Sequence, residues 1–305
     1  MQARGGKNME RMTAIVPDSE YQTIQQFISD SGWDHQQVMN RVAEIADELI
    51  GDENDSCLLL DESGIRKKGT KSVGVARQWL GNIGKVDNGQ VGVFAALCKG
   101  TCATLVNGRI YLPNEWTENK GRCVDAKIPL DDRTFLTKDE IALQMVTQAR
   151  ASGMRFGWVG ADGGYGKGLS FCSELERLGE TFIVDIHSDF HMYRNDPKPY
   201  IPEDKGGRGR KPSRYQTDQK SIRVDAWVAK QKERKWTTIT LRDSTKGALK
   251  YDVLSEMVWL MSKETGETHR WHLVVRRNAE THSDYKYSLS NAAEETPLQR
   301  LAYMQ

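Results

Sequence analysis

The chain has 305 residues with 43 basic and 42 acidic side chains, so its formal net charge is +1, and 38% of its residues are hydrophobic. This length is sufficient for one large domain or for two to three modest ones with a real core. The mean hydropathy of −0.63 and the lack of an apolar stretch long enough to span a bilayer exclude an integral membrane protein. The first ten residues do not resemble a secretory signal, and the five cysteines contain no CxxC pair, so we expect a protein of the reducing cytosol.

The near-neutral total hides an uneven distribution of charge. Residues 1–60 hold four basic and eleven acidic side chains, a local net charge of −7, whereas residues 201–250 hold fourteen basic and six acidic ones, a local net charge of +8. Such a basic block is typical either of a solvated surface or of a phosphate-binding one, and charge alone does not choose between them.

The hydrophobic pattern divides the chain into three kinds of sequence. Apolar residues at helical spacing predict a short helical hairpin in the first 55 residues, with one helix after Ser19 and one from Asp34 to Gly51. A capping box at Thr137 opens a further helix, which ends at Gly153. Strands are predicted over residues 57–60, 72–79, 90–98, 103–112, 156–161 and 181–186, and a helix precedes Gly179. This order of three or four strands, helix, strand, helix and strand predicts an α/β fold with a mixed sheet.

The third kind of sequence runs from about residue 188 to residue 277. It begins with a loop rich in proline, glycine and basic residues, Pro197 to Arg214, which has no periodicity. Strands are then predicted over residues 221–229, 235–242, 249–261 and 270–276, so this part of the chain is expected to be a β-rich insertion with a basic entry.

Two aspartates, Asp61 and Asp162, each follow a buried strand directly. If the two strands are parallel neighbours, both carboxylates lie at one edge of the sheet, where ligands gather in α/β proteins. Neighbouring carboxylates repel each other unless a cation lies between them, and oxygen ligands favour Mg²⁺ or Mn²⁺. From the spacing alone, a turn residue or helix cap is the more common reason for an aspartate after a strand, by roughly two to one.

Other motifs give weaker signals. His187 and His191, with Asp189, have the spacing of a zinc site only on a helix, and polar loop residues are the simpler interpretation. The segment from Gly160 to Gly166 is rich in glycine but lacks the lysine of a phosphate loop, so its glycines are expected to permit a tight turn and the close approach of a backbone or of a DNA strand.

Several blocks of the sequence resemble bacterial insertion-sequence transposases of the DDE superfamily. The resemblance extends from about Asn8 to the last residue, and the matching stretches are 61–69, 72–79, 84–93, 111–113, 158–166, 240–243, 271–273 and 286–291. It implies a ribonuclease-H-like core, a mixed sheet flanked by helices, with an N-terminal helical segment and a β-rich insertion. It also implies that Asp61 and Asp162 are the first two acids of a catalytic triad that binds Mg²⁺ or Mn²⁺. Ile65 and Arg66 stand where family members often have an aromatic residue and proline.

In the family the third acid is a glutamate on a helix that follows a Pro-Leu-x-Arg-Leu stretch. Here this stretch is Pro297 to Leu301, and the expected glutamate falls past Gln305. Glu294 and Glu295 precede the helix and do not match the family position. We therefore expect a helix stub that is frayed, with a poorly covered apolar face at Leu298 and Leu301.

Two basic segments are predicted to bind DNA. Arg66, Lys67 and Lys68 follow the first acid and are placed to contact phosphates, although they are also compatible with a solvated loop. The segment with Arg208, Arg210 and Lys211 resembles an AT-hook, which fits a narrow minor groove, and a flexible basic linker is an equally good interpretation.

The resemblance thus predicts a bacterial transposase that cleaves transposon ends and transfers the strands, with double-stranded DNA as its partner. The protein is expected to act as a homodimer on DNA, to make no membrane contact, and to be associated with the nucleoid in the cytoplasm. Two alternatives stay open: a catalytically inactive DNA-binding remnant, and a metal-dependent nuclease that uses Glu294 or Asp185. The predicted divisions are 1–55 (helical), 56–189 (first part of the core), 190–277 (insertion) and 278–305 (return to the core and start of the last catalytic helix).

Overall fold

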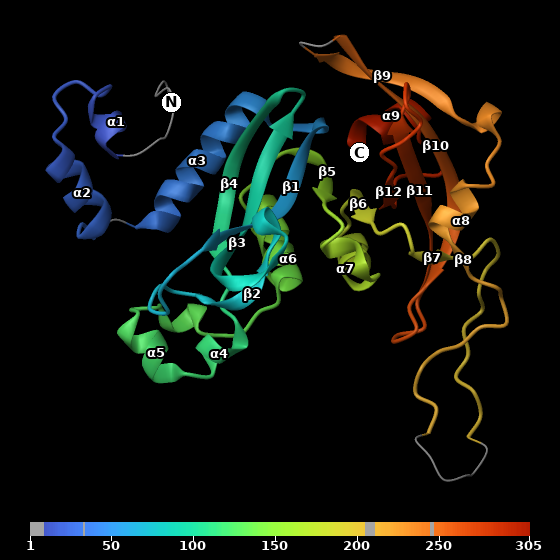
Figure 1. Cartoon of the computed structure of the whole chain (residues 1–305), viewed down its shortest axis with the longest axis horizontal. Helices are drawn as coiled ribbons and strands as arrows, with labels where there is room; N and C mark the ends of the chain where they lie inside the picture. The colour runs from blue at the N-terminus through green and yellow to red at the C-terminus, as the bar shows by residue number, and fades with distance from the viewer. Residues whose placement is uncertain (1–8, 33, 205–210, 245–246) are drawn as a thin grey trace. The chain divides into compact units, whose positions relative to one another are not determined.

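A computed structural model describes residues 9–32, 34–204, 211–244 and 247–305 (Figure 1). The chain forms two compact units, Met1–Val42 and Ala43–Gln305. Within the described ranges, no helix combines the length and the apolar character that crossing a membrane would need.

The first unit is helical, as the sequence predicts. It contains α1 (Met9–Thr13), α2 (Tyr21–Ser29) and the start of α3 (His35–Ile50). The Asp34 carboxylate accepts hydrogen bonds from the backbone N–H groups of Gln36 and Gln37, so it is the expected N-cap of α3. Ser19 is not a cap, because its hydroxyl donates to the backbone carbonyls of Thr13 and Val16 instead. α2 has no buried residue.

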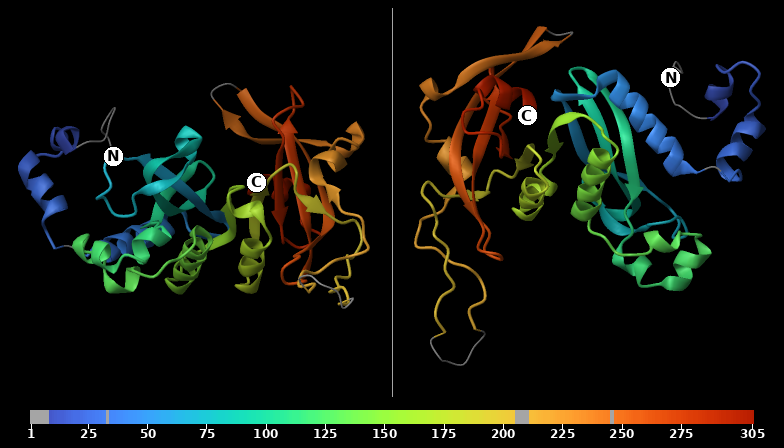
Figure 2. Two further views of the ribbon diagram at one scale, coloured as in Figure 1. Left: turned by 60° about the horizontal axis from the view of Figure 1, so that its bottom comes forward. Right: turned by 180° about the vertical axis from the view of Figure 1, so that it is seen from behind.

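One large sheet runs through the second unit, in the strand order β2-β3-β1-β5-β6-β12-β11-β10-β9, with β4 paired to the outside of β3 (Figures 1 and 2). Its first four strands are antiparallel neighbours. They are β1 (Asp52–Arg66), β2 (Ala76–Leu80), β3 (Lys85–Lys99) and β4 (Cys102–Ile110). A small cluster with Trp116 and Cys123 at its centre follows, on α4 (Asn114–Thr117) and α5 (Lys120–Asp125).

Two crossovers then add parallel strands beside β1. The helix α6 (Lys138–Ala151) leads to β5 (Phe156–Ala161), and α7 (Ser170–Arg177) leads to β6 (Phe182–Ile186). The capping box of α6 is present as predicted, with Thr137 and Glu140 bonded reciprocally. Strand order β4-β3-β1-β5-β6, with three antiparallel strands and two parallel ones, gives the mixed, helix-flanked sheet of a ribonuclease-H-like core.

The β-rich part of the chain extends this same sheet. It contributes β9 (Thr237–Ser244), β10 (Gly247–Met261), β11 (Thr268–Asn278) and β12 (Lys286–Ser290), and a separate ribbon forms from β7 (His191–Met192) and β8 (Ile222–Arg223). The predicted strand over residues 221–229 is wrong, because only β8 is extended and α8 (Val224–Val228) follows it. Val224, Trp227 and Val228 are buried at the i, i+3, i+4 spacing of a helix, and this decided the conformation.

Both faces of the sheet are covered. Leu58 and Leu60 of β1 share one apolar cluster with residues of α6 and α7. Cys57 of β1 and Trp158 of β5 point to the other face and share a second cluster with α9 (Leu298–Met304).

The expectation of a frayed C-terminal stub is therefore wrong. Leu301 is 1% exposed and Leu298 is half-buried, and the Arg300 guanidinium lies 4.6 Å from the centre of the Trp158 ring. A seven-residue helix has little stability by itself, so its packing against the sheet holds it in place.

Candidate functional site

The two aspartates singled out in the sequence lie side by side. The strands β1 and β5 are parallel, and their last paired residues are Leu60 and Ala161. Asp61 and Asp162 come next in this register, so their side chains lie on the same face of the sheet as Cys57 and Trp158. This is the face that α9 covers.

Asp61 does not end its strand, contrary to the sequence-based expectation. The antiparallel pairing of β1 with β3 continues to Arg66, which lies opposite Gly89. Asp61 is therefore held on both sides, by β3 through Phe94 and by the neighbouring end of β5. Its carboxylate accepts a hydrogen bond of 2.7 Å from the backbone N–H of Glu62.

A tight turn positions Asp162. Its carboxylate accepts a hydrogen bond of 2.9 Å from the backbone N–H of Gly164. Gly166 in the same turn approaches β6 so closely that a Cβ atom would lie 1.8 Å from the Asp185 carbonyl oxygen. The expected close backbone approach of this glycine-rich segment is thus confirmed, and it brings β6 and its acid next to the pair.

Among the described residues, neither Asp61 nor Asp162 has an ion-pair partner, whereas Glu62 is paired with Lys138. The surrounding protein removes water from the Asp61 carboxyl, and this raises its pKa, as do the negative charges of Asp162 and Glu62; the hydrogen bond from Glu62 opposes the change. A divalent cation between the two carboxylates would remove the repulsion. The donor set consists of oxygen atoms only, which fits Mg²⁺ or Mn²⁺.

A third aspartate belongs to the same row. Ala161 pairs with Val184, so Asp185 of β6 is the next-strand neighbour of Asp162. Asp185 already has cationic and polar partners, because Lys286 lies 2.8 Å from its carboxylate and the Ser288 hydroxyl donates to it at 2.6 Å. The Gln305 side chain donates to the same Ser288 hydroxyl at 2.7 Å, so the end of α9 lies at this row.

The two glutamates before α9 do not belong to this row of acids. Glu294 forms two hydrogen bonds of 2.6 Å with the Arg270 guanidinium, which lowers its pKa, and it is exposed. Glu295 is exposed too. The sequence of α9 itself contains no acidic residue.

A buried tyrosine near the acids was not foreseen from the sequence. Tyr165 is 4% exposed, and among the described residues its hydroxyl has no hydrogen-bond partner. Burial raises the pKa of this hydroxyl, and the negative charges of Glu62, Asp162, Asp139 and Asp61 raise it further. Only the fold reveals this, because a tyrosine after a glycine-rich turn carries no sequence signal for it.

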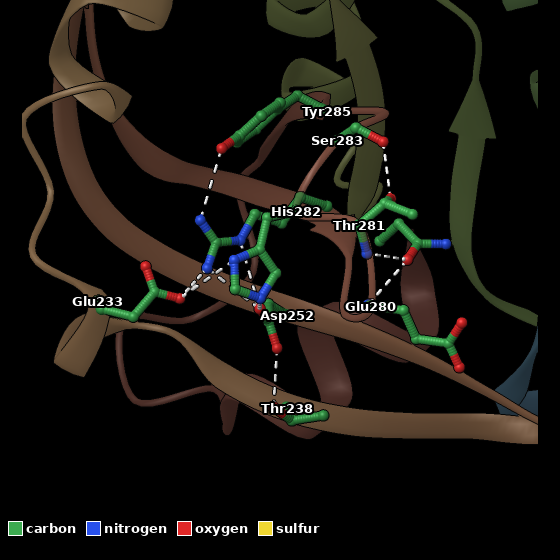
Figure 3. A network of polar contacts seen from close by, with 10 residues as sticks. Glu233, Thr238, Asp252, Glu280, Thr281, His282, Ser283 and Tyr285 are labelled. Carbon is green, nitrogen blue, oxygen red and sulfur yellow. Dashed lines mark hydrogen bonds and ion pairs between the residues drawn. The ribbon is translucent and has the colours of Figure 1, made fainter.

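A second group of possible metal ligands lies on the β9–β11 side of the sheet, and it too was not foreseen. Ligand atoms of Glu233, Asp252 and His282 lie within 4.8 Å of one another (Figure 3). The guanidinium of Arg277 already bonds to Glu233 and, at 3.1 Å, to Asp252. An arginine thus supplies the positive charge in this cluster, and a metal ion would have to displace it.

The predicted DNA-binding residues lie on exposed segments. Arg66 is 3.1 Å from the Asp87 carboxylate, which offsets part of its charge, and Lys68 is exposed. Arg208 and Arg210 lie outside the described residues. Lys211 is described and exposed, with its amino group 3.5 Å from Asp204.

The histidine pair shows no metal geometry. His191 shares a hydrogen bond of 3.1 Å with the Ser221 hydroxyl, and neither His187 nor His191 joins a group of possible metal ligands within the described ranges.

Two sequence comparisons agree with the resemblance found in the sequence. A sequence profile described as "DDE superfamily endonuclease" matches residues 1–248. The "Probable transposase for insertion sequence element IS701" of Microchaete diplosiphon is 30% identical over 189 residues, 61% of this chain and 46% of that protein, so the chain spans about half the length of this relative. The NurA nuclease from Sulfolobus solfataricus aligns at 8% identity over 94% of this chain and 86% of that one, with a TM-score of 0.33, which is too low to bear on fold or function.

Proposed function

The chain belongs to the DDE superfamily endonucleases, and on this premise we propose that it is the catalytic part of an insertion-sequence transposase. Its reaction would be the metal-dependent cleavage of transposon ends followed by strand transfer, with double-stranded DNA as substrate. The observation that supports this most is that Asp61 of β1 and Asp162, directly after the parallel neighbour β5, come next to each other in the register.

Asp61 and Asp162 would hold Mg²⁺ or Mn²⁺. When bound, the metal would activate the attacking water or 3′-hydroxyl and stabilise the leaving oxygen of the phosphodiester. The protein's own contribution is to fix the two carboxylates, one through β3 and β5 and the other through the Gly164 turn. Arg66, Lys67 and Lys68, at the end of β1, would contact phosphates of the DNA, and Arg208, Arg210 and Lys211 would add further contacts.

The third ligand is proposed to come from a continuation of α9, because the family places a glutamate there and α9 ends at the row of acids. Without that glutamate, the 305-residue polypeptide would bind DNA but not cleave it. A nuclease that uses Asp185 is the second candidate, because Asp185 is in register with Asp162. It would have to break the ion pair with Lys286.

Titration calorimetry with Mn²⁺ tests the metal site in the full 305-residue chain. Asp61→Asn and Asp162→Asn should each weaken Mn²⁺ binding by about tenfold or more. Mutation of a residue that only hydrogen-bonds to a metal ligand already costs about tenfold in affinity, and loss of a ligand itself should cost at least as much. Asp61→Asn should not lower the free energy of unfolding, because the raised pKa of Asp61 means that folding makes its charged form less favourable than in the unfolded chain. Asp162→Asn should not lower it either, because the change removes one of two neighbouring acids that repel each other. Because the pKa of Asp61 is raised, protons compete with the metal at a higher pH than they would at an ordinary aspartate. The Mn²⁺ affinity should therefore begin to fall at a higher pH as the solution is acidified.

The matched control is Asp131→Asn, an exposed aspartate in a short turn far along the chain from both acids. It should leave Mn²⁺ binding unchanged. If Glu233→Gln weakened binding while Asp61→Asn and Asp162→Asn did not, the metal would belong to the arginine cluster and the assignment would be wrong.

A further inference from the structure

A pocket of about 440 Å³ with an unusual charge lies beside α8, in the β-rich part of the chain. Five of its eight lining residues are basic, and none is acidic; Trp227 and Ile222 contribute apolar surface. The basic residues are Arg194, Lys230, Lys232, Arg234 and Lys235. We call this the basic α8 pocket.

Four of these cations lack an ion-pair partner among the described residues. Arg194, Lys230, Lys232 and Arg234 are exposed and make no ion pair with another residue in the described part of the chain. Lys235 is the exception, with its amino group 3.3 Å from Glu256 and 5.9 Å from the centre of the Trp227 ring. Cations gathered around one hollow repel one another, so the pocket favours an anionic ligand.

Glu233 is the acidic residue nearest to these cations in the sequence, but it does not line the pocket. Glu233 stands between Lys232 and Arg234, but its carboxylate bonds to the Arg277 guanidinium of β11 (Figure 3). The short 3-10 helix Glu233–Lys235 thus presents an acid to the sheet and bases to the pocket.

The backbone that carries these cations is held in place. The N–H of Val224 bonds to the Phe190 carbonyl at 2.9 Å, and Trp227 and Val228 are buried in the core. The Gln231 side chain donates to the Trp227 carbonyl at 2.7 Å. A pocket with a fixed backbone loses less entropy when it binds than a flexible basic loop does.

We propose that the basic α8 pocket binds the phosphate backbone of double-stranded DNA, as a contact that shares no residue with the row of acids. This inference rests on the proposed function, which supplies DNA as the substrate. Separated lysines and arginines around an open hollow suit a chain of phosphates, each neutralised by one cation with release of its counterions. The pocket would hold DNA in register and would not read its sequence.

Binding of a short labelled duplex of mixed sequence, measured over a range of salt concentrations, tests this inference. In Lys230→Ala/Lys232→Ala, the slope of log affinity against log salt should become shallower by about two units, near 0.9 for each lost phosphate contact. The control Lys120→Ala/Lys250→Ala removes the same charge from exposed positions outside the pocket and should leave the slope within half a unit of the parent chain.

The possible results distinguish a failure of the pocket proposal from a failure of the proposed function. A parent chain that binds the duplex, with equal slopes for both double variants, overturns the pocket and leaves the proposed function standing. A parent chain that fails to bind any duplex at low salt overturns both. Unchanged thermal unfolding of Lys230→Ala/Lys232→Ala shows that a loss of binding is not a loss of fold.

Discussion

A chimaera in which α9 continues into the acid-bearing helix of a family member is expected to nick supercoiled plasmid DNA in the presence of Mn²⁺, whereas the 305-residue polypeptide should leave it intact. Two carboxylates hold one ion loosely, but catalysis with two metal ions needs enough anionic ligands to fix both beside the scissile phosphate. The end of α9 lies at Ser288, which bonds to Asp185 in the row of acids, so a continuing helix would start next to the site.

The chimaera with glutamine in place of that glutamate is the matched control. Its nicking activity should be lower by roughly three orders of magnitude or more. Residues that act as one catalytic unit are not additive, so the loss of one ligand costs nearly as much as the loss of all. Mn²⁺-dependent nicking by the 305-residue chain itself would contradict the proposal. If Asp185→Asn then abolished this nicking, Asp185 would be the third ligand.

The Arg277→Met variant is expected to lose about 3–5 kcal/mol of unfolding free energy, the cost of breaking a buried ion pair. The side chains of Arg277 and Asp252 are only 6% and 8% exposed, and they lie directly opposite each other on β11 and β10. The guanidinium also stacks 4.2 Å from the centre of the Trp236 ring. Without Arg277, the Asp252 carboxylate stays buried, with the Thr238 hydroxyl at 2.7 Å and the His282 ring nitrogen at 3.5 Å as side-chain partners among the described residues.

Arg276→Met on the same strand is the control, and urea unfolding is the measurement. Arg276 is half-buried with its guanidinium 4.7 Å from the centre of the Tyr251 ring, so its loss should cost about 1 kcal/mol or less. Arg277→Met/Asp252→Leu should be more stable than Arg277→Met, because the double change removes the unpaired charge. Equal losses for Arg276→Met and Arg277→Met would show that the cluster is not a stabilising ion pair.

Local signals predicted the elements that depend on local physics. The capping box at Thr137 fixes the start of α6, and the apolar run over 156–161 has the bounds of β5. In both cases neighbouring residues in the sequence determine the conformation. The parallel pairing that brings Asp61 next to Asp162 was only a condition of the sequence-based argument, and the structure fulfils it.

Elements fixed by distant contacts could not be predicted in this way. β1 continues through Ser63 and Gly64 because β3 pairs with it, although these residues do not favour strands. The short α9 is stable because the sheet covers Leu301, a contact that helix propensity does not contain. The Arg277–Asp252 pair depends on the register of β10 and β11. The pocket beside α8 depends on Arg194 lying next to residues of the segment 222–235.

The central claim is that Asp61 and Asp162 hold one divalent ion together. Fe²⁺ bound in place of Mn²⁺ generates hydroxyl radicals with ascorbate and peroxide, and these cut the backbone next to the metal. We predict cuts near residues 61 and 162, with a weaker cut near Asp185, and their loss in Asp61→Asn. Cuts near residues 233, 252 and 282 that persist in Asp61→Asn would place the metal in the arginine cluster and contradict the account.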